Sequence, residues 1–270
     1  KIDIDIRVFE TSSRLLKKVR ISGGGRCNVT HNIFEVKEFC SNYPRGLKEL
    51  ISPFQTFQAA NTVEWFKEKG VRLKHESDGR MFPVTNSSET IINCFMQAAN
   101  KHEIKLLTKM NVKSLKKLEN GQISLFINEN ESFIADSVLI ATGSMPGGYR
   151  LAKSLGHTIT EIAPSLFTFK IEDLILENLS GTSFPNAGLT LKVDGAKPFY
   201  QKGPLLITHW GLSGPALLKL SAWAAREMMH TKYKAKIIVN WLGVEHQDDA
   251  EKILTSIKNN NIRSTISKDY

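Results

Sequence analysis

The sequence predicts an α/β fold, in which a sheet carries an antiparallel inset and is followed by a β-rich region. Three observations predict it. The chain opens with a segment in which apolar and charged residues alternate, Lys1–Glu10. A helix, a strand and a meander of short strands then lead to the very apolar segment Val138–Ala141, an order of elements typical of an α/β sheet with an antiparallel inset. Beyond Pro164 the pattern changes to short strands.

Each element of the first region follows from a local pattern. Apolar residues at every second position indicate a strand that ends at Glu10. Apolar residues three or four positions apart predict a helical region over residues 46–70, with Gly70 as its C-terminal stop. A further helix begins near Ser87, with Ser87 and Thr90 as competing caps. The remaining strands are predicted at 71–73, 81–84, 105–108, 112–118, 123–127 and 132–142.

The second region is predicted to consist of short strands around one helix. The strands are expected at 166–171, 188–193, 204–208 and 236–241, and the helix at 215–230. The stretch 258–270 is polar and shows no closing element. We place a domain boundary near Ala163–Pro164, which divides the chain into domains of residues 1–163 and 164–270.

The composition is that of an ordinary folded protein. Of the 270 residues, 41% are hydrophobic and 23% are charged, which excludes a disordered, collagen-like or fibrous chain. No run reaches the roughly 18 apolar residues of a membrane span, and we expect a cytoplasmic protein with no membrane partner. Three cysteines without a C-x-x-C pair argue against a disulfide framework or a thiolate zinc site, and no His or carboxylate cluster predicts another metal site.

The net charge of +9 favours a phosphate-bearing partner, which is either a nucleic acid or a phosphorylated cofactor. Much of the excess lies in residues 1–74, which contain 14 basic and 8 acidic residues. The chain has neither a long Lys/Arg tract nor an aromatic RNA-binding signature. Nucleic acid is therefore the less favoured partner.

A glycine-rich segment is the strongest candidate for contact with a ligand. It consists of Ser22, Gly23, Gly24, Gly25, Arg26, Cys27 and Asn28. Three consecutive glycines permit positive φ and let backbone N–H groups approach a bulky ligand, and such a turn forms an anion-binding nest beside which an arginine adds a charged fork. A flexible surface loop is the alternative interpretation.

Two further candidates lie at the ends of predicted strands. Glu10 is placed where dinucleotide-binding folds use an acidic residue to accept hydrogen bonds from ribose hydroxyls, although a surface glutamate is the simpler interpretation. Thr142 and Gly143 follow the apolar strand, where small residues let a flat ligand lie against the backbone. A plain strand-to-turn exit explains the same residues.

In the second region, His209 and Trp210 form the candidate acid/base and stacking pair. Gly211 and Gly214 indicate a tight backbone there, and Pro215 suits the first turn of the next helix. A structural role is the alternative for a single histidine.

Several motifs occur together in one order. They are Val8–Glu10 (VFE), Ile21–Thr30 (ISGGGRCNVT), Gly79–Val84 (GRMFPV), Val138–Gly143 (VLIATG), Gly156 and His157 before Pro164–Leu166, and Thr208–Pro215 (THWGLSGP). Over about residues 8–242 the chain closely resembles the bacterial FAD-dependent oxidoreductases of the BaiN/aminoacetone-oxidase type. The SGGGRCN and THxGLSGP blocks are specific to that family, whereas ATG is shared by many flavoproteins.

The resemblance implies a Rossmann-like FAD-binding domain and a β-barrel-containing insert that begins near Ser165. It implies that Glu10 holds the adenosine ribose, that residues 23–28 run beside the pyrophosphate and flavin, and that Val112 presents its backbone to the adenine. Thr142 and Gly143 would close over the cofactor. The family's first strand, with its phosphate-binding glycines, would precede Lys1, and its closing portion would follow Tyr270, so we expect a longer native chain.

The expected activity is transfer of a hydride or electron pair between a small organic substrate or NAD(P)H and bound flavin, with His209 as the candidate catalytic residue. Two alternatives are a non-catalytic flavin-binding regulator and a flavoprotein that acts on RNA. The motifs leave the substrate, the electron donor and the oligomeric state open.

Overall fold

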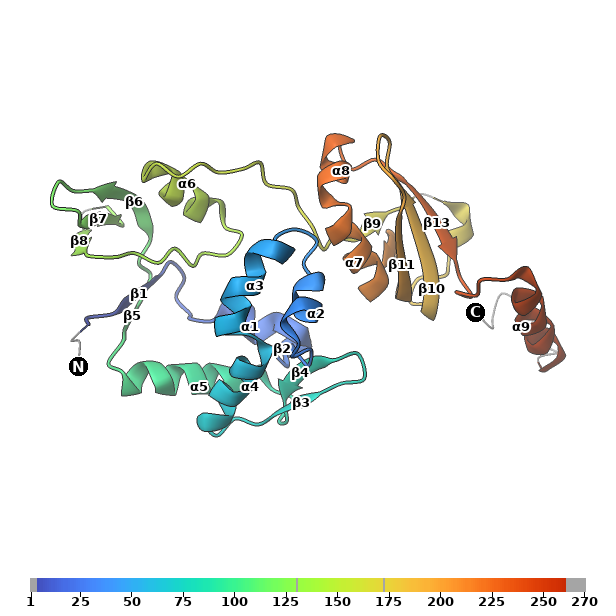
Figure 1. Cartoon of the computed structure of the whole chain (residues 1–270), viewed down its shortest axis with the longest axis horizontal. Coiled ribbons are helices and arrows are strands. Elements are labelled where there is room, and N and C mark those ends of the chain that lie inside the picture. The colour runs from blue at the N-terminus through green and yellow to red at the C-terminus, as the bar shows by residue number, and fades with distance from the viewer. Residues whose placement is uncertain (1–3, 130, 172, 261–270) are drawn as a thin grey trace. The chain divides into compact units, whose positions relative to one another are not determined.

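A computed structural model describes residues 4–129, 131–171 and 173–260 of the chain. The chain divides into two compact units, Lys1–Thr160 and Glu161–Tyr270 (Figure 1). No helix within the described residues is both long and apolar enough to cross a lipid bilayer.

The first unit contains a parallel strand pair with a long crossover between the strands. Strand β1 (Arg7–Glu10) pairs with β5 (Lys105–Thr108), and Glu10 lies opposite Thr108. Parallel strands require such a crossover, because a tight turn cannot join them. The crossover contains α1 (Lys17–Ile21), a 3₁₀ turn (Ser22–Gly25), α2 (Val36–Ser41), α3 (Leu47–Thr56), α4 (Ala59–Glu68), α5 (Ser88–Lys101) and a small antiparallel sheet.

The helical region expected at 46–70 is two helices, because the backbone is extended at Phe57 and Gln58. The Gln58 side chain accepts a hydrogen bond from the Ala60 N–H, and the Asn61 side chain accepts one from the Gln58 N–H. This reciprocal cap starts α4 as a new helix. Of the two candidate caps for α5, Ser87 is the N-cap, and its hydroxyl accepts a hydrogen bond from the Glu89 N–H.

Two three-stranded antiparallel sheets complete the first unit. One has the order β2 (Thr30–His31), β4 (Arg80–Pro83), β3 (Leu73–His75), and the other is the meander of β6 (Val112–Lys117), β7 (Ile123–Ile127) and β8 (Glu131–Ala135). Helix α6 (Pro146–Ser154) packs on the meander through Leu151. This helix had no counterpart among the predicted elements.

The expectation of a buried strand at Val138–Ala141 is wrong. The segment belongs to no strand, and the side chain of Leu139 is 90% exposed. Val138 and Ile140 instead pack against the core of the meander. A strand needs a hydrogen-bonded neighbour, and in the described chain the parallel sheet consists of β1 and β5 alone.

The second unit is a five-stranded antiparallel sheet with two helices on one face (Figure 1). The strand order is β13 (Lys236–Asn240), β10 (Ser183–Lys192), β11 (Phe199–Thr208), β12 (Gly211–Ser213), β9 (Phe169–Lys170). The single helix expected at 215–230 is divided at Ala224 into α7 (Pro215–Trp223) and α8 (Ala225–His230). Helix α9 (Gln247–Asn260) was not predicted, and residues 261–270 of the expected polar tail lie outside the described residues.

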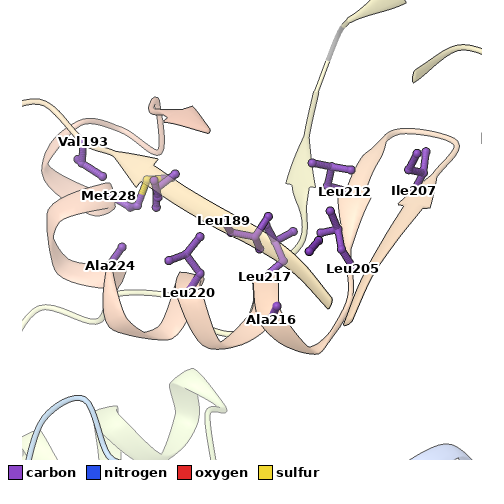
Figure 2. Packing of buried hydrophobic residues seen from close by; sticks show 12 residues of the cluster. Leu189, Val193, Leu205, Ile207, Leu212, Ala216, Leu217, Leu220, Ala224 and Met228 are labelled. Atoms are coloured by element: carbon purple, nitrogen blue, oxygen red, sulfur yellow. The ribbon is translucent and has the colours of Figure 1, made fainter. Parts of the chain in front are cut away.

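The core of the second unit lies between the sheet and α7. Leu217 and Leu220 of α7 meet Leu189 and Leu205 of the sheet, and all four are at most 2% exposed (Figure 2). Burying one such side chain stabilises a fold by about 1.5–3 kcal/mol. The α/β class, with its antiparallel inset and β-rich second unit, is thus confirmed.

Candidate functional site

The glycine loop, residues Ser22–Asn28, has a left-handed backbone at each of its three glycines. Their φ values are 56° at Gly23, 69° at Gly24 and 85° at Gly25. A Cβ on Gly23 would lie 2.7 Å from the backbone nitrogen of Asn28, so only glycine fits there. Around Gly24 and Gly25, no heavy atom of a described residue other than the adjoining ones lies within 4 Å of the position a Cβ would take. These two glycines therefore present bare, exposed backbone that a flat group can approach.

The base of this loop is held by buried and hydrogen-bonded neighbours. The Cys27 N–H bonds the Ser22 carbonyl at 3.0 Å, and the Val29 N–H bonds the Met81 carbonyl of β4 at 2.8 Å. The Cys27 side chain is 6% exposed and packs with Phe66 and Cys94. Asn28 is exposed beside it.

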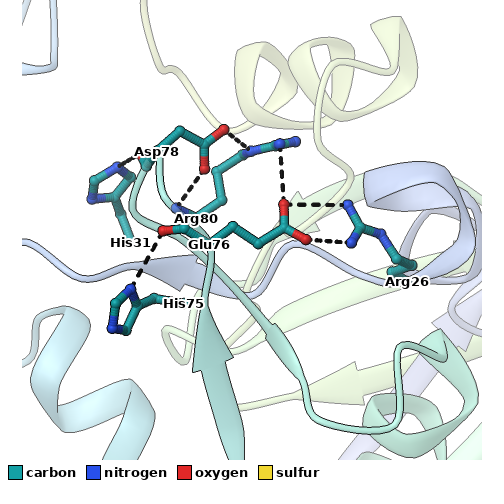
Figure 3. Close-up of polar contacts among 6 residues, drawn as sticks. All are labelled: Arg26, His31, His75, Glu76, Asp78 and Arg80. Atoms are coloured by element: carbon teal, nitrogen blue, oxygen red, sulfur yellow. Dashed lines mark hydrogen bonds and ion pairs between the residues drawn. The ribbon is translucent and has the colours of Figure 1, made fainter.

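Arg26 ties the loop to the β3–β4 hairpin rather than extending into solvent (Figure 3). Its Nη1 lies 2.5 Å from Oε1 of Glu76, and its guanidinium carbon lies 4.0 Å from the centre of the Phe82 ring. The hydrogen bond from Arg26 lowers the pKa of Glu76 below its ordinary value. Arg80 bonds the second Glu76 oxygen at 3.3 Å and Asp78 at 2.6 Å, so the same carboxylate joins two arginines.

Thr142 and Gly143 lie at the start of the connection to α6, with left-handed backbone at Gly143 (φ 61°). The Lys18 Nζ of α1 lies 3.2 Å from the position a Cβ on Gly143 would take. The Thr142 side chain lies directly against Gly148 of α6. Lys18 thus brings a cation from the segment before the glycine loop to the Thr142–Gly143 turn.

The remaining two cofactor candidates of the first unit flank the core of the β6–β8 meander. Val112 packs in this core, as does Phe9, the neighbour of Glu10. Glu10 is half-buried at the end of β1, where its Oε1 accepts a hydrogen bond of 2.7 Å from the Ser12 N–H. Among the described residues no donor bonds its Oε2, so this oxygen is free to accept a ligand hydroxyl.

Around the predicted cofactor residues of the first unit, the structure shows two sets of contacts. Val112 and the neighbours of Glu10 and Thr142 share the meander core, and Lys18 links Gly143 to the segment that carries the glycine loop. Sequence reasoning missed Lys18. The only sequence signal for it is the basic segment 14–20, which contributes to the net charge of the first 74 residues.

His209 lies in the second unit, in the tight turn between β11 and β12. It is exposed, and its ring meets that of Trp210 edge to face, with 4.1 Å between the ring centres. The Thr208 hydroxyl closes the turn by donating to the Gly211 carbonyl at 3.1 Å. A Cβ on Gly211 would overlap the carbonyl of Phe169, so glycine is required there.

Throughout the described residues, no group of three or more His, Cys, Asp or Glu side chains is arranged to hold a metal ion. Cys27, Cys40 and Cys94 are free and buried. Burial raises the pKa of the Cys94 thiol, which disfavours the reactive thiolate.

Comparison with known proteins identifies several relatives. The chain is 28% identical over 233 residues to a ribosomal RNA dihydrouridine synthase of Haemophilus influenzae, which covers 82% of this chain and 56% of the relative. It is 23% identical over 248 residues to a 3-dehydro-bile acid delta(4,6)-reductase of Clostridium scindens, covering 89% and 59%. It is 28% identical over 218 residues to a ribosomal RNA dihydrouridine synthase of Escherichia coli, covering 77% and 52%.

The chain thus spans about half the length of the curated relatives it matches. The family model described as the HI0933-like protein Rossmann domain matches residues 1–259, nearly the whole of the chain. The expected resemblance to BaiN-type flavoproteins is confirmed by this match: the chain belongs to the HI0933-like Rossmann-domain family.

Proposed function

We propose that the first unit forms part of a FAD site, and that the protein is an oxidoreductase that transfers a hydride or electron pair between a reduced donor and its substrate. The observation that carries the proposal is the bare backbone of Gly24 and Gly25, which has open space where side chains would project. Family membership and a relative named as a reductase support the same activity.

The residues of the first unit fit the chemical parts of this cofactor. The free Oε2 of Glu10 suits a ribose hydroxyl, because a carboxylate only accepts hydrogen bonds. The ammonium group of Lys18 suits the pyrophosphate, and Gly24, Gly25 and Gly143 let flat rings lie against the backbone. Arg26 positions the glycine loop through its hydrogen bond with Glu76. FAD, when bound, supplies the redox chemistry.

His209 is the residue of the second unit that we propose to move a proton. Its ring is exposed in a turn that the Thr208–Gly211 hydrogen bond closes, and the Trp210 ring contacts one side of it. An imidazole ring can act as a general acid or a general base. If His209→Ala leaves turnover and its pH profile unchanged, this role is wrong.

The test of the cofactor is an absorption spectrum of the intact protein after incubation with FAD and removal of free flavin. A flavin spectrum that bleaches under anaerobic NADH or NADPH supports the oxidoreductase and identifies its donor. Protein that stays colourless overturns the proposal. A bound flavin that no donor reduces would instead indicate the non-catalytic regulator.

A second candidate function is reduction of a base in RNA. It is favoured by two relatives named as ribosomal RNA dihydrouridine synthases and by the net charge of +9. The alternative substrate is a small enone, as the name of the bile acid reductase indicates for that relative. Mass spectrometry distinguishes the two substrates. If the substrate is RNA, incubation of the reduced protein with ribosomal RNA adds two hydrogen atoms to a uridine. If the substrate is a small enone, incubation with a steroid enone adds two hydrogen atoms to the steroid.

A further inference from the structure

Helix α7 packs on one face of the sheet of the second unit (Figure 2). On the opposite face Tyr200 and Ile238 are exposed. Alternate residues of β10 and β11 pack on α7, and the residues between them face the other way. We call this second surface the open face. It carries the side chains of Thr190, Lys192, Tyr200, Lys202, Pro204, Leu206, Lys236, Ile238 and Asn240.

An aromatic platform lies in the middle of the open face. Tyr200 of β11 is opposite Thr190 of β10, which is opposite Ile238 of β13. The Tyr200 side chain is 71% exposed and that of Ile238 is 43% exposed. These residues line a shallow hollow of about 420 Å³, together with Lys202 and Asn240. The site is therefore a concave surface with one aromatic ring available for stacking.

The charge of the open face has a single sign. It carries Lys192, Lys202 and Lys236, and no acidic side chain of β10, β11 or β13 faces the same way. None of the three lysines makes an ion pair with a described residue. Lys192 and Lys236 lie directly opposite each other on neighbouring strands, an arrangement that is unfavourable for like charges. A bound anion would relieve this repulsion.

We propose that the open face binds a single-stranded segment of RNA, with a base stacked on Tyr200 and phosphates held by the three lysines. Stacking on an exposed aromatic ring between lysines is how sequence-tolerant surfaces hold single strands, because every base has a π-face. Lone lysines and one tyrosine would suit a small anion less well, since the charged positions extend over three strands. The inference deepens the second candidate function and rests on it for the identity of the nucleic acid.

The test is binding of a fluorescently labelled single-stranded oligouridine of about 12 nucleotides, within the length that single-strand-binding domains cover, to the intact protein. Tyr200→Ala is expected to weaken binding about tenfold, whereas Tyr200→Phe keeps the stacking ring and stays within about twofold. The triple substitution of Lys192, Lys202 and Lys236 by Gln is expected to reduce the slope of log affinity against log salt by about 2, because each phosphate contact on a single strand contributes about 0.7.

A matched control removes the same three charges from elsewhere in the chain, by changing Lys116, Lys219 and Lys232 to Gln. These lysines are exposed and lie outside the open face, so the control is expected to change the salt slope by less than about 1. The proposal is overturned if the two triple variants reduce the salt slope equally. It is also overturned if the wild-type protein does not bind the oligomer at low salt. A Tyr200→Ala variant that changes the sedimentation coefficient of the protein, and not its RNA affinity, would identify the face as a contact between copies.

Flavin content is measured on every variant in the same preparations. Because the open-face residues lie in the second unit and the proposed flavin contacts in the first, normal flavin content with lost RNA binding assigns the defect to the open face. RNA binding by a protein that stays colourless after incubation with FAD would overturn the FAD proposal and leave the RNA proposal intact.

Discussion

Arg26 and Glu76 are fifty positions apart in sequence and form a close ion pair, 2.5 Å between Nη1 and Oε1. The pair joins the glycine loop to the hairpin of β3 and β4, and Phe82 lies under the same guanidinium. Because the side chains are about one third exposed, solvent screens the attraction, and its main effect is to position the loop. Arg26, which the sequence predicts to bind phosphate, thus also supports the glycine loop from the hairpin.

The first prediction concerns the pH dependence of stability. The pKa of Glu76 is lowered by its hydrogen bond with Arg26, so its contribution to the free energy of unfolding is present above its unfolded pKa of about 4.5 and lost as the pH falls through the lower folded value. The difference in unfolding free energy between wild type and Glu76→Gln is expected to shrink as the pH falls from about 5 to about 3. Urea denaturation at a series of pH values measures it.

Glu64→Gln is the matched control for this measurement. Its carboxylate pairs with Lys67 on the exposed surface of α4, 3.2 Å away. A difference between wild type and Glu76→Gln that stays constant over the acidic range would show that the Arg26–Glu76 pair does not contribute as described.

The second prediction separates the two roles of the loop glycines, which are to allow the tight backbone of the loop and to leave space for the cofactor. Gly23→Ala is expected to lower the free energy of unfolding by about 1–3 kcal/mol, because it combines positive φ with a collision against the backbone nitrogen of Asn28. Gly24→Ala meets no neighbour, so it carries only the left-handed penalty of about 1–2 kcal/mol. Its methyl group fills the space proposed for the cofactor, and the FAD dissociation constant is expected to rise at least tenfold. Flavin fluorescence titration measures this, and unchanged affinity in a folded Gly24→Ala protein would remove the loop from the site.

The elements of the fold that could be predicted from the sequence are those specified by residues close together in the chain. The glycine loop, the β3–β4 hairpin and the order of the meander strands follow from turn residues and alternation, which are properties of neighbouring positions. The apolar run Val138–Ala141 misled, because hydrophobicity indicates burial but does not supply the hydrogen-bonded neighbour that a strand requires.

The glycines of the candidate site could be predicted from the sequence, but the contacts of its charged side chains could not. Lys18 and Gly143 are 125 positions apart, and no pattern within either segment indicates that they meet. The partner of Arg26 was hidden for the same reason, as Glu76 lies in a separate hairpin. The open face required strand register, since Lys192, Tyr200 and Lys236 share a surface only once β10 is paired with both β11 and β13.

The third prediction tests Lys18, the cationic residue that the structure places beside Gly143. Lys18→Gln is expected to raise the FAD dissociation constant about tenfold, because a hydrogen bond to a charged group contributes about 1.5 kcal/mol or more. Lys17→Gln removes the same charge from the neighbouring exposed position and is the control. Equal effects of the two substitutions would indicate general electrostatic attraction, and the specific role of Lys18 beside Gly143 would then be wrong.

The fourth prediction uses the contact between Thr142 and Gly148. A Cβ on Gly148 would overlap the Thr142 hydroxyl, so Gly148→Ala must displace that side chain even though alanine favours a helix. Gly148→Ala is therefore expected to weaken FAD binding about tenfold through the displaced turn, while Thr142→Ala, which removes the overlapping hydroxyl, restores much of the affinity when combined with it. A double-mutant cycle on FAD affinity and unfolding free energy measures the coupling. Additive effects would show that Gly148 does not position Thr142, because the rescue depends on the two side chains competing for one space.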